Sequence, residues 1–112
     1  MTAPSPAHRE LAAGRWQRFS LAEQLANVGA EVGRLRRRRD GVEPAAAPAF
    51  ARALELLDLT LADPRWQGRR REIARAREIL CDTVNGGREY GATLEELDRY
   101  FLAFATLTRR GR

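Results

Sequence analysis

The chain has 112 residues, 44% of them hydrophobic, and a formal net charge of +5 at pH 7. This length fits one domain with a single core, and the short apolar runs exclude a membrane-spanning helix. The lone cysteine, Cys81, excludes an internal disulfide. Because the N-terminal residues also lack the basic and apolar regions of a signal peptide, the sequence predicts a cytoplasmic protein.

All 20 basic residues are arginines. Alanine and glycine are abundant as well, which is the composition that a GC-rich genome encodes whatever the function. We therefore attribute part of the arginine excess to codon usage, and the positive charge alone is a weak indication of a nucleic-acid partner.

Residues 1–19 begin with a Pro-rich stretch and predict an N-terminal arm that can form a short helix over 8–15. Trp16 and Phe19 are expected to anchor this arm to the core. The first long helix is predicted from Ser20, which forms a capping box with Glu23, to about Arg39. Its apolar stripe has the spacing of one helical face and comprises Leu21, Leu25, Val28, Val32 and Leu35.

A loop with Pro44 and Pro48 is predicted to lead into a second helix that ends at Asp63-Pro64. The expected stripe of this helix is Phe50, Leu54, Leu57 and Leu61, widened by Ala53 and Leu56.

Trp66 opens the third segment, with a turn at Gly68 and a stop at Asn85-Gly86-Gly87. The expected core positions of this helix are Ile73, Ala76, Leu80 and Val84. A fourth helix begins at a second capping box, Thr93 with Glu96. Its stripe is the most aromatic and comprises Leu94, Leu97, Tyr100, Phe101, Phe104 and Leu107.

Strand signals are missing from the sequence, since apolar and polar residues do not alternate and β-branched residues are few. Short loops make neighbouring helices antiparallel. The sequence therefore predicts an all-α fold, an antiparallel up-down four-helix bundle over 20–112 preceded by the arm over 1–19.

A stripe of small residues runs beside the apolar face of the first helix: Ala22, Ala26, Gly29, Ala30 and Gly33. A glycine inside a helix costs about 1 kcal/mol relative to alanine, so two of them four residues apart indicate the close approach of another backbone. Packing within the chain is one interpretation. The other is an interface with a second copy or another protein.

Two arginine clusters are candidates for binding nucleic acid or an acidic partner: Arg36, Arg37, Arg38 and Arg39, and Arg65, Arg69, Arg70 and Arg71. The helix dipole favours cations at the end of the first helix but disfavours them at the start of the third. We expect both clusters at the same end of the bundle, merged into one patch that can hold phosphates. The alternative is a solvated end on which arginines pair with carboxylates.

The catalytic inventory of the sequence is incomplete. The only histidine, His8, lies in the arm, and Cys81 has no histidine partner, so we expect an inert, semi-buried thiol. Motifs for phosphate loops and paired-cysteine metal sites are missing from the sequence. We therefore predict a protein that is not an enzyme, with no catalytic residues, no cofactor and no metal.

Polar residues that border the apolar faces are the remaining candidates for a site: Gln24, Glu31, Asp58, Glu72 and Asp98. Carboxylates inside a bundle can bind a divalent ion. Pairing with arginines such as Arg77 at the rim of the core is the favoured interpretation.

Four segments resemble a pattern that recurs in small, uncharacterised prokaryotic proteins: AEQLANVGAEVGR (22–34), RALELLDLTLADPRW (52–66), REILCD (77–82) and EYG (89–91). The resemblance covers most of residues 16–105. It implies a stand-alone helical domain of bacterial or archaeal type and carries no activity with it.

These observations predict an interaction or accessory protein that self-associates or binds a protein partner through the first helix. The alternative is a small nucleic-acid-binding protein that uses its arginine-rich end. A membrane is not expected to be a partner.

Overall fold

The computed structural model describes residues 14–40 and 46–110, and all regular secondary structure within those ranges is helical. The predicted all-α class is thereby confirmed. The long helices are α2 (Leu21–Asp40), α3 (Ala46–Ala62), α4 (Arg70–Val84) and α5 (Leu94–Arg110), and a short 3-10 helix, η1 (Pro64–Arg69), joins α3 to α4. Most of the predicted arm, including His8, lies outside the described residues.

Both predicted capping boxes form. The backbone N–H of Glu23 donates to Ser20 Oγ at 3.1 Å and the N–H of Ser20 donates to Glu23 Oε1 at 2.9 Å, so the orphan donors at the start of α2 are satisfied. Thr93 and Glu96 repeat this exchange at the start of α5.

The start of α3 differs from the prediction, because the helix begins at Ala46 and contains Pro48 in its first turn. Proline is tolerated there since the N–H that it lacks has no partner within the first turn of a helix. At the other end, the helix stops before Asp63-Pro64 as predicted.

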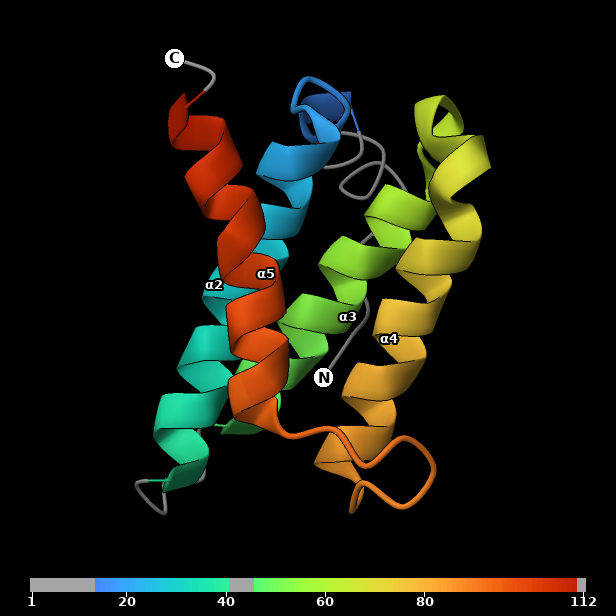
Figure 1. Ribbon diagram of the computed structural model, residues 1–112. Coiled ribbons are helices and arrows are strands. Elements are labelled where there is room, and N and C mark those ends of the chain that lie inside the picture. Colours follow the sequence, from blue (N-terminus) through green and yellow to red (C-terminus); the bar gives the residue numbers. More distant parts are fainter. Residues whose placement is uncertain (1–13, 41–45, 111–112) are drawn as a thin grey trace.

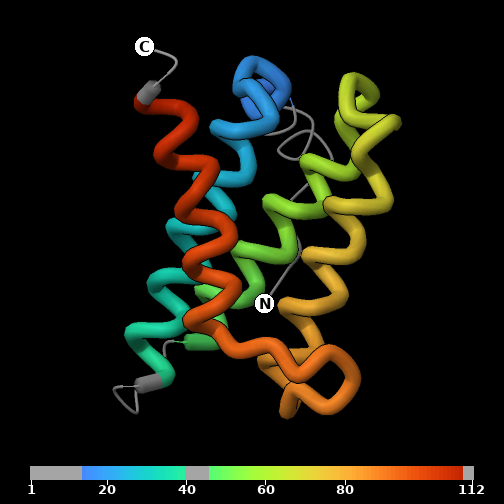
Figure 2. Tube along the Cα trace, in the orientation of Figure 1, coloured from blue at the N-terminus to red at the C-terminus, as the bar shows by residue number. Residues whose placement is uncertain are grey.

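Successive long helices run in alternating directions, with α2 and α4 pointing one way and α3 and α5 the other (Figure 1). Their packing is uneven. α2 lies against both α5 and α3 over most of its length, whereas α4 contacts α3 and α5 much less. The tube trace shows α4 and α5 meeting near the loop that joins them and splaying apart away from it (Figure 2).

The core is built by the predicted stripes of α2 and α4 and by part of the predicted α5 stripe, chiefly Leu97 and Phe101. On α3 the stripe is centred one residue earlier than predicted, because Ala49, Ala53 and Thr60 are buried with Leu57. The larger Phe50, Leu54 and Leu61 are half-buried beside it. Alanines at the line of contact let α3 approach α2 closely, and the larger side chains fill the space to either side.

Gly29 and Gly33 of α2 face α5 of the same chain. A Cβ atom at Gly29 would lie 2.6 Å from Cβ of Phe101, a distance that real side chains do not reach. The close approach that the glycines indicate is therefore made within the chain. The interpretation of the stripe as an interface with a second copy or another protein stays a prediction.

We expect Gly29→Ala to lower the free energy of unfolding by about 1–3 kcal/mol, because Phe101 and α5 must shift to admit the methyl group. The matched control is Gly33→Ala, one turn along the same helix. Its nearest neighbour is Nη1 of Arg37 at 3.2 Å, the end of a flexible side chain that can move aside. Helix propensity then dominates, and the change should be neutral or stabilising by up to about 1 kcal/mol. Urea denaturation measures both, and equal effects at the two positions would contradict the tight α2–α5 contact.

Candidate functional site

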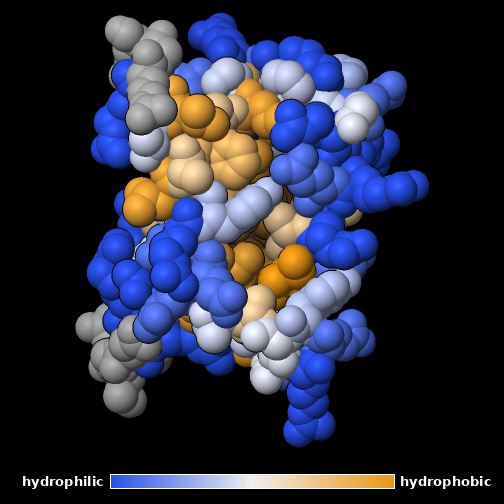
Figure 3. Space-filling view, viewed as in Figure 1, coloured by the Kyte–Doolittle hydropathy of each residue, from blue (hydrophilic) through white to orange (hydrophobic). Residues whose placement is uncertain are grey.

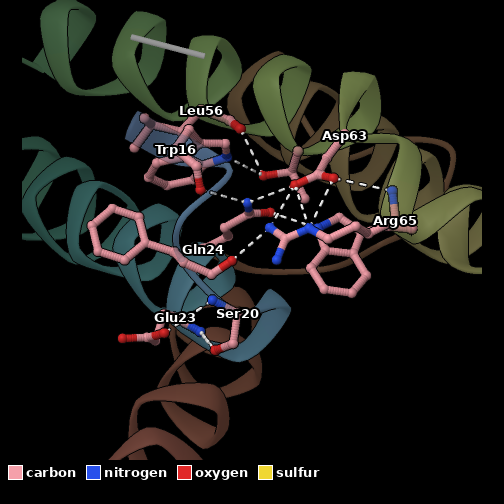
Figure 4. A network of polar contacts seen from close by, with 10 residues as sticks. Trp16, Ser20, Glu23, Gln24, Leu56, Asp63 and Arg65 are labelled. Atoms are coloured by element: carbon pink, nitrogen blue, oxygen red, sulfur yellow. Dashed lines mark hydrogen bonds and ion pairs between the residues drawn. The ribbon is translucent and has the colours of Figure 1, made fainter. Parts of the chain in front are cut away.

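A buried polar network links α2, α3 and η1, and Asp63 lies at its centre. The side chain is 1% exposed. Its carboxylate accepts hydrogen bonds from the backbone N–H of Arg65 at 3.1 Å, from the Arg65 guanidinium at 2.7 Å and from Gln24 Nε2 at 3.1 Å (Figure 4). Asp63 also caps the short helix that follows, with its side chain accepting from the backbone N–H of Arg65.

Gln24 and Thr60 extend this network to two tryptophans. The buried Gln24 side chain donates to the carbonyl oxygen of Trp16 at 2.9 Å and accepts from Trp66 Nε1 at 2.9 Å. Trp16 Nε1 donates to Thr60 Oγ1 at 3.0 Å, and that hydroxyl donates to the Leu56 carbonyl at 2.9 Å. Each buried donor of the network has an acceptor, so the network joins the arm, α2, α3 and η1.

The electrostatics of Asp63 indicate a structural role. Its pKa is lowered to about 2, first by the hydrogen bonds from the Arg65 side chain and further by the Arg65 backbone and Gln24, against the opposing effect of burial. At neutral pH this carboxylate is ionised, so it has no proton to donate. Its hydrogen bonds also occupy the oxygen lone pairs that a metal ion would need. We therefore assign this network to the fold.

The other bordering carboxylates are dispersed and paired with arginines, which confirms the favoured interpretation. Asp58 binds Arg77 at 2.8 Å, Glu72 binds Arg69 at 2.9 Å, Asp98 binds Arg36 at 2.9 Å, and Glu31 binds Arg34. Within the described ranges, no three His, Cys, Asp or Glu side chains gather as a metal site would need. Cys81 is half-buried on α4, with the Arg77 guanidinium 4.0 Å from its sulfur.

The two arginine clusters do not merge, which corrects the sequence prediction. Parallel α2 and α4 are separated by the antiparallel α3, so the end of α2 and the start of α4 lie at opposite ends (Figure 1). Contacts agree with this placement. Arg39 donates to the carbonyl of Val84, where α4 ends, at 3.0 Å, whereas Arg65 donates to the carbonyl of Phe19, before α2 begins, at 2.7 Å.

The small-residue stripe forms one wall of a shallow hollow between α2 and α5. This α2–α5 hollow measures about 300 Å³ and includes Ala26, Gly29, Ala30 and Gly33 on one wall. Leu102, which is 56% exposed, lies on the other wall. Ala22 is half-buried nearer the start of α2. The stripe thus supports packing within the chain and leaves a small surface beside it.

A larger apolar surface lies on the other side of α5, where α4 and α5 splay apart. This α4–α5 groove holds about 340 Å³ and is lined by Glu72, Arg75, Ala76, Ile79, Ala92, Glu96, Leu97 and Tyr100. Hydrophobic side chains gather between the two helices in the space-filling view (Figure 3). The sequence predicts the Tyr100 and Leu107 positions as core, but they are 38% and 53% exposed.

Tyr100 bridges the groove. Its hydroxyl donates to Glu72 Oε1 of α4 at 3.2 Å, and its ring makes edge contacts with Phe101 and Phe104 at centroid distances of 5.1 and 5.4 Å. Burial, together with the negative charge and the hydrogen bond of Glu72, raises the pKa of Tyr100. The phenol therefore remains a neutral donor at physiological pH, and the groove keeps an apolar floor between polar walls.

Sequence reasoning missed the groove because the α5 stripe is continuous and gives no sign that α4 turns away from it. It also missed the network around Asp63, although Gln24 among the apolar residues of α2 was a usable signal. A glutamine on a buried face needs partners for both its amide donors and its carbonyl.

The chain matches no family model, no curated protein and no solved structure. The resemblance to small prokaryotic proteins therefore stays a prediction. In the part of the chain that the structure describes, none of the helices combines the length and apolarity needed to cross a bilayer.

The network predicts a specific pH dependence. Because the folded-state pKa of Asp63 lies below its ordinary value of 3.8, its ionisation contributes stability above that pH, which is lost as the pH falls through about 2. The contribution is on the order of 2 kcal/mol. Denaturation of the wild type and of Asp63→Asn at pH 5 and pH 2 separates this effect from that of the other carboxylates. The wild type should lose about 2 kcal/mol more than the variant on acidification, and parallel losses would show that Asp63 is not held ionised.

Proposed function

We propose that this is a non-enzymatic interaction protein that self-associates through the α4–α5 groove, with a second copy packed against the same face. The observation that carries the proposal is the open apolar groove beside the exposed Tyr100 and Leu107. Apolar side chains at such a surface gain roughly 25 cal/mol for each Å² that a partner removes from water.

The fold gives a reason for this surface. We interpret the four long helices as an up-down bundle in which the seam between α4 and α5 stays open, since α2 takes most of the packing of α5. A second copy would cover the floor that α4 leaves uncovered. Exposed apolar surface of this kind, rimmed by polar residues, is typical of protein interaction sites.

The charges at the rim favour a second copy over an unrelated partner. Arg75 lines one wall of the groove and Glu96 the other, so the rim carries both signs. In a two-fold symmetric pair the same patch meets itself, and Arg75 can then face the partner subunit's Glu96. A strongly basic or acidic partner would meet a charge of its own sign on one wall.

Two exposed leucines of α5 provide a matched test. Leu107 lies seven residues after Tyr100 and therefore on the groove side of the helix, whereas Leu102 lies on the α2–α5 hollow. Leu107→Glu should weaken self-association at least about 10-fold, because a carboxylate would be buried in the interface. Leu102→Glu should leave it unchanged.

Sedimentation equilibrium over a range of protein concentrations measures the association of the wild type and both variants, with circular dichroism as the control for folding. A wild type that stays monomeric throughout would refute self-association. If Leu102→Glu alone dissociates the pair, the interface lies on the α2–α5 hollow, and the assignment to the α4–α5 groove is wrong.

A further inference from the structure

Exposed arginines gather at the end of the molecule where α2 and α4 begin. We call this surface the arginine end and define it by Arg15, Arg18, Arg65, Arg70 and Arg71, which are all exposed. Three separate segments supply them: the arm before α2, the 3-10 helix η1 and the first turn of α4 (Figure 1). The hydrogen bond from Arg65 to the carbonyl of Phe19 ties the first two segments together.

The positions of Arg70 and Arg71 are not explained by the fold. Both lie in the first turn of α4, where the helix dipole disfavours cations by roughly 0.3–1 kcal/mol each. The neighbouring carboxylate, Glu72, is already paired with Arg69. Within residues 14–40 and 46–110, neither Arg70 nor Arg71 forms an ion pair with a described residue. An anionic ligand would supply the counter-charge that the chain does not.

An exposed aromatic ring lies within this surface, which the sequence did not predict. Phe19 is 38% exposed, next to Arg18 in the chain and held by Arg65 through its carbonyl oxygen. Its ring meets the edge of the buried Trp16 at 5.7 Å, with an interplanar angle of 79°. The network around Asp63 fixes Trp16, so Phe19 stands on a rigid support.

Phe19 also borders a hollow of about 390 Å³ between the arm, α2 and α3. Its lining combines apolar side chains with the polar Arg15, Asn27 and Arg52, and it also includes two carboxylates, Glu31 and Glu55. Guanidinium and amide groups beside an aromatic ring are the groups that recognise a nucleobase, by stacking on its face and by hydrogen bonding to its edge.

We propose that the arginine end binds single-stranded nucleic acid, with phosphates held by the arginines and a base stacked on Phe19 at the mouth of this hollow. One guanidinium group can donate two parallel hydrogen bonds to two oxygens of a phosphate, so a phosphate ligand accounts for the arginines on this surface. The exposed Phe19 ring favours single strands, because their bases are free to stack on it. The bases of a duplex stack on one another, so a duplex exposes mainly its backbone. This inference does not depend on self-association.

The test uses fluorescence anisotropy of the full chain with labelled single-stranded DNA and RNA, and with duplexes of the same sequence. Contact with about four phosphates predicts that a fourfold rise in salt weakens single-strand binding roughly 50-fold. Phe19→Ala should weaken single-strand binding about 10-fold with the same salt slope, and Phe19→Trp should restore it. Thermal unfolding of both variants shows whether the arm stays in place.

The charge term is tested with Arg70→Gln/Arg71→Gln against Arg37→Gln/Arg39→Gln, which removes the same charge at the opposite end. The first pair should reduce the slope of log affinity against log salt by about 1.4, and the second should leave it unchanged. Arg70→Lys/Arg71→Lys, which keeps the charge, should keep the salt slope but lose part of the affinity, because an ammonium group does not bind two phosphate oxygens in parallel.

Three results would overturn the proposal. They are salt-insensitive or undetectable binding of the single strands, equal losses from the two double variants, and equal affinity for duplex and single strand with no effect of Phe19→Ala. Binding to vesicles rich in phosphatidylserine without binding to any oligonucleotide would also overturn it, because the ligand would then be a membrane surface.

Discussion

The rest of the structure depends on the ionised carboxylate of Asp63. Burying a charge is costly unless hydrogen bonds and an opposite charge replace water, and here Arg65 and Gln24 supply both. The same carboxylate caps η1 where the chain leaves α3 and, through Gln24, holds Trp16. This ion thus helps to fix the direction in which the chain leaves α3 and the position of the arm over the core, and removing Arg65 would leave the Asp63 carboxylate buried without its counter-charge.

The openness of the α4–α5 groove follows from the packing on the other side of α5. Gly29 lets the backbone of α5 come close to α2, and Ala49 and Ala53 do the same for α3. Both neighbours are drawn toward α2, whereas α4 has only Ala76 as a small residue among its buried positions. Because α4 does not approach its neighbours as closely, the α4–α5 groove stays open. The small residues of α2 therefore favour an open α4–α5 groove, although they do not line it.

Much of the fold could be predicted from the sequence, because the signals are local. The capping residues Ser20 and Thr93 and the stop at Asp63-Pro64 depend on the backbone chemistry of one turn, and they form as predicted. The stripe of α3 was misplaced by one residue, because alanine is a weak hydrophobic signal although it permits the closest contacts. Periodicity identifies which face is apolar but not how near the facing helix comes.

The candidate surfaces could be predicted only in part, because they depend on which segments meet. Arg65, Arg70 and Arg71 were identified as a cluster, but their neighbour was taken to be the arginine run that ends α2. Because successive long helices alternate in direction, the arginines at the end of α2 lie at the opposite end of the molecule, where Arg39 contacts Val84. Among these arginines, Arg65 contacts Phe19 instead, and Trp16 holds the Phe19 ring in place, contacts that a pattern of single residues does not encode.

Glu72 is where the two proposed surfaces meet. It accepts the hydroxyl of Tyr100 across the α4–α5 groove, and it pairs with Arg69 beside the arginine end. Its single charge therefore cannot neutralise Arg70 and Arg71 as well, which leaves these cations for a ligand. A symmetric pair formed through the groove would carry two arginine ends on one assembly. Two linked sites on one strand bind more tightly than either alone when the strand can span them, so self-association would strengthen a weak single-strand contact without any new residue.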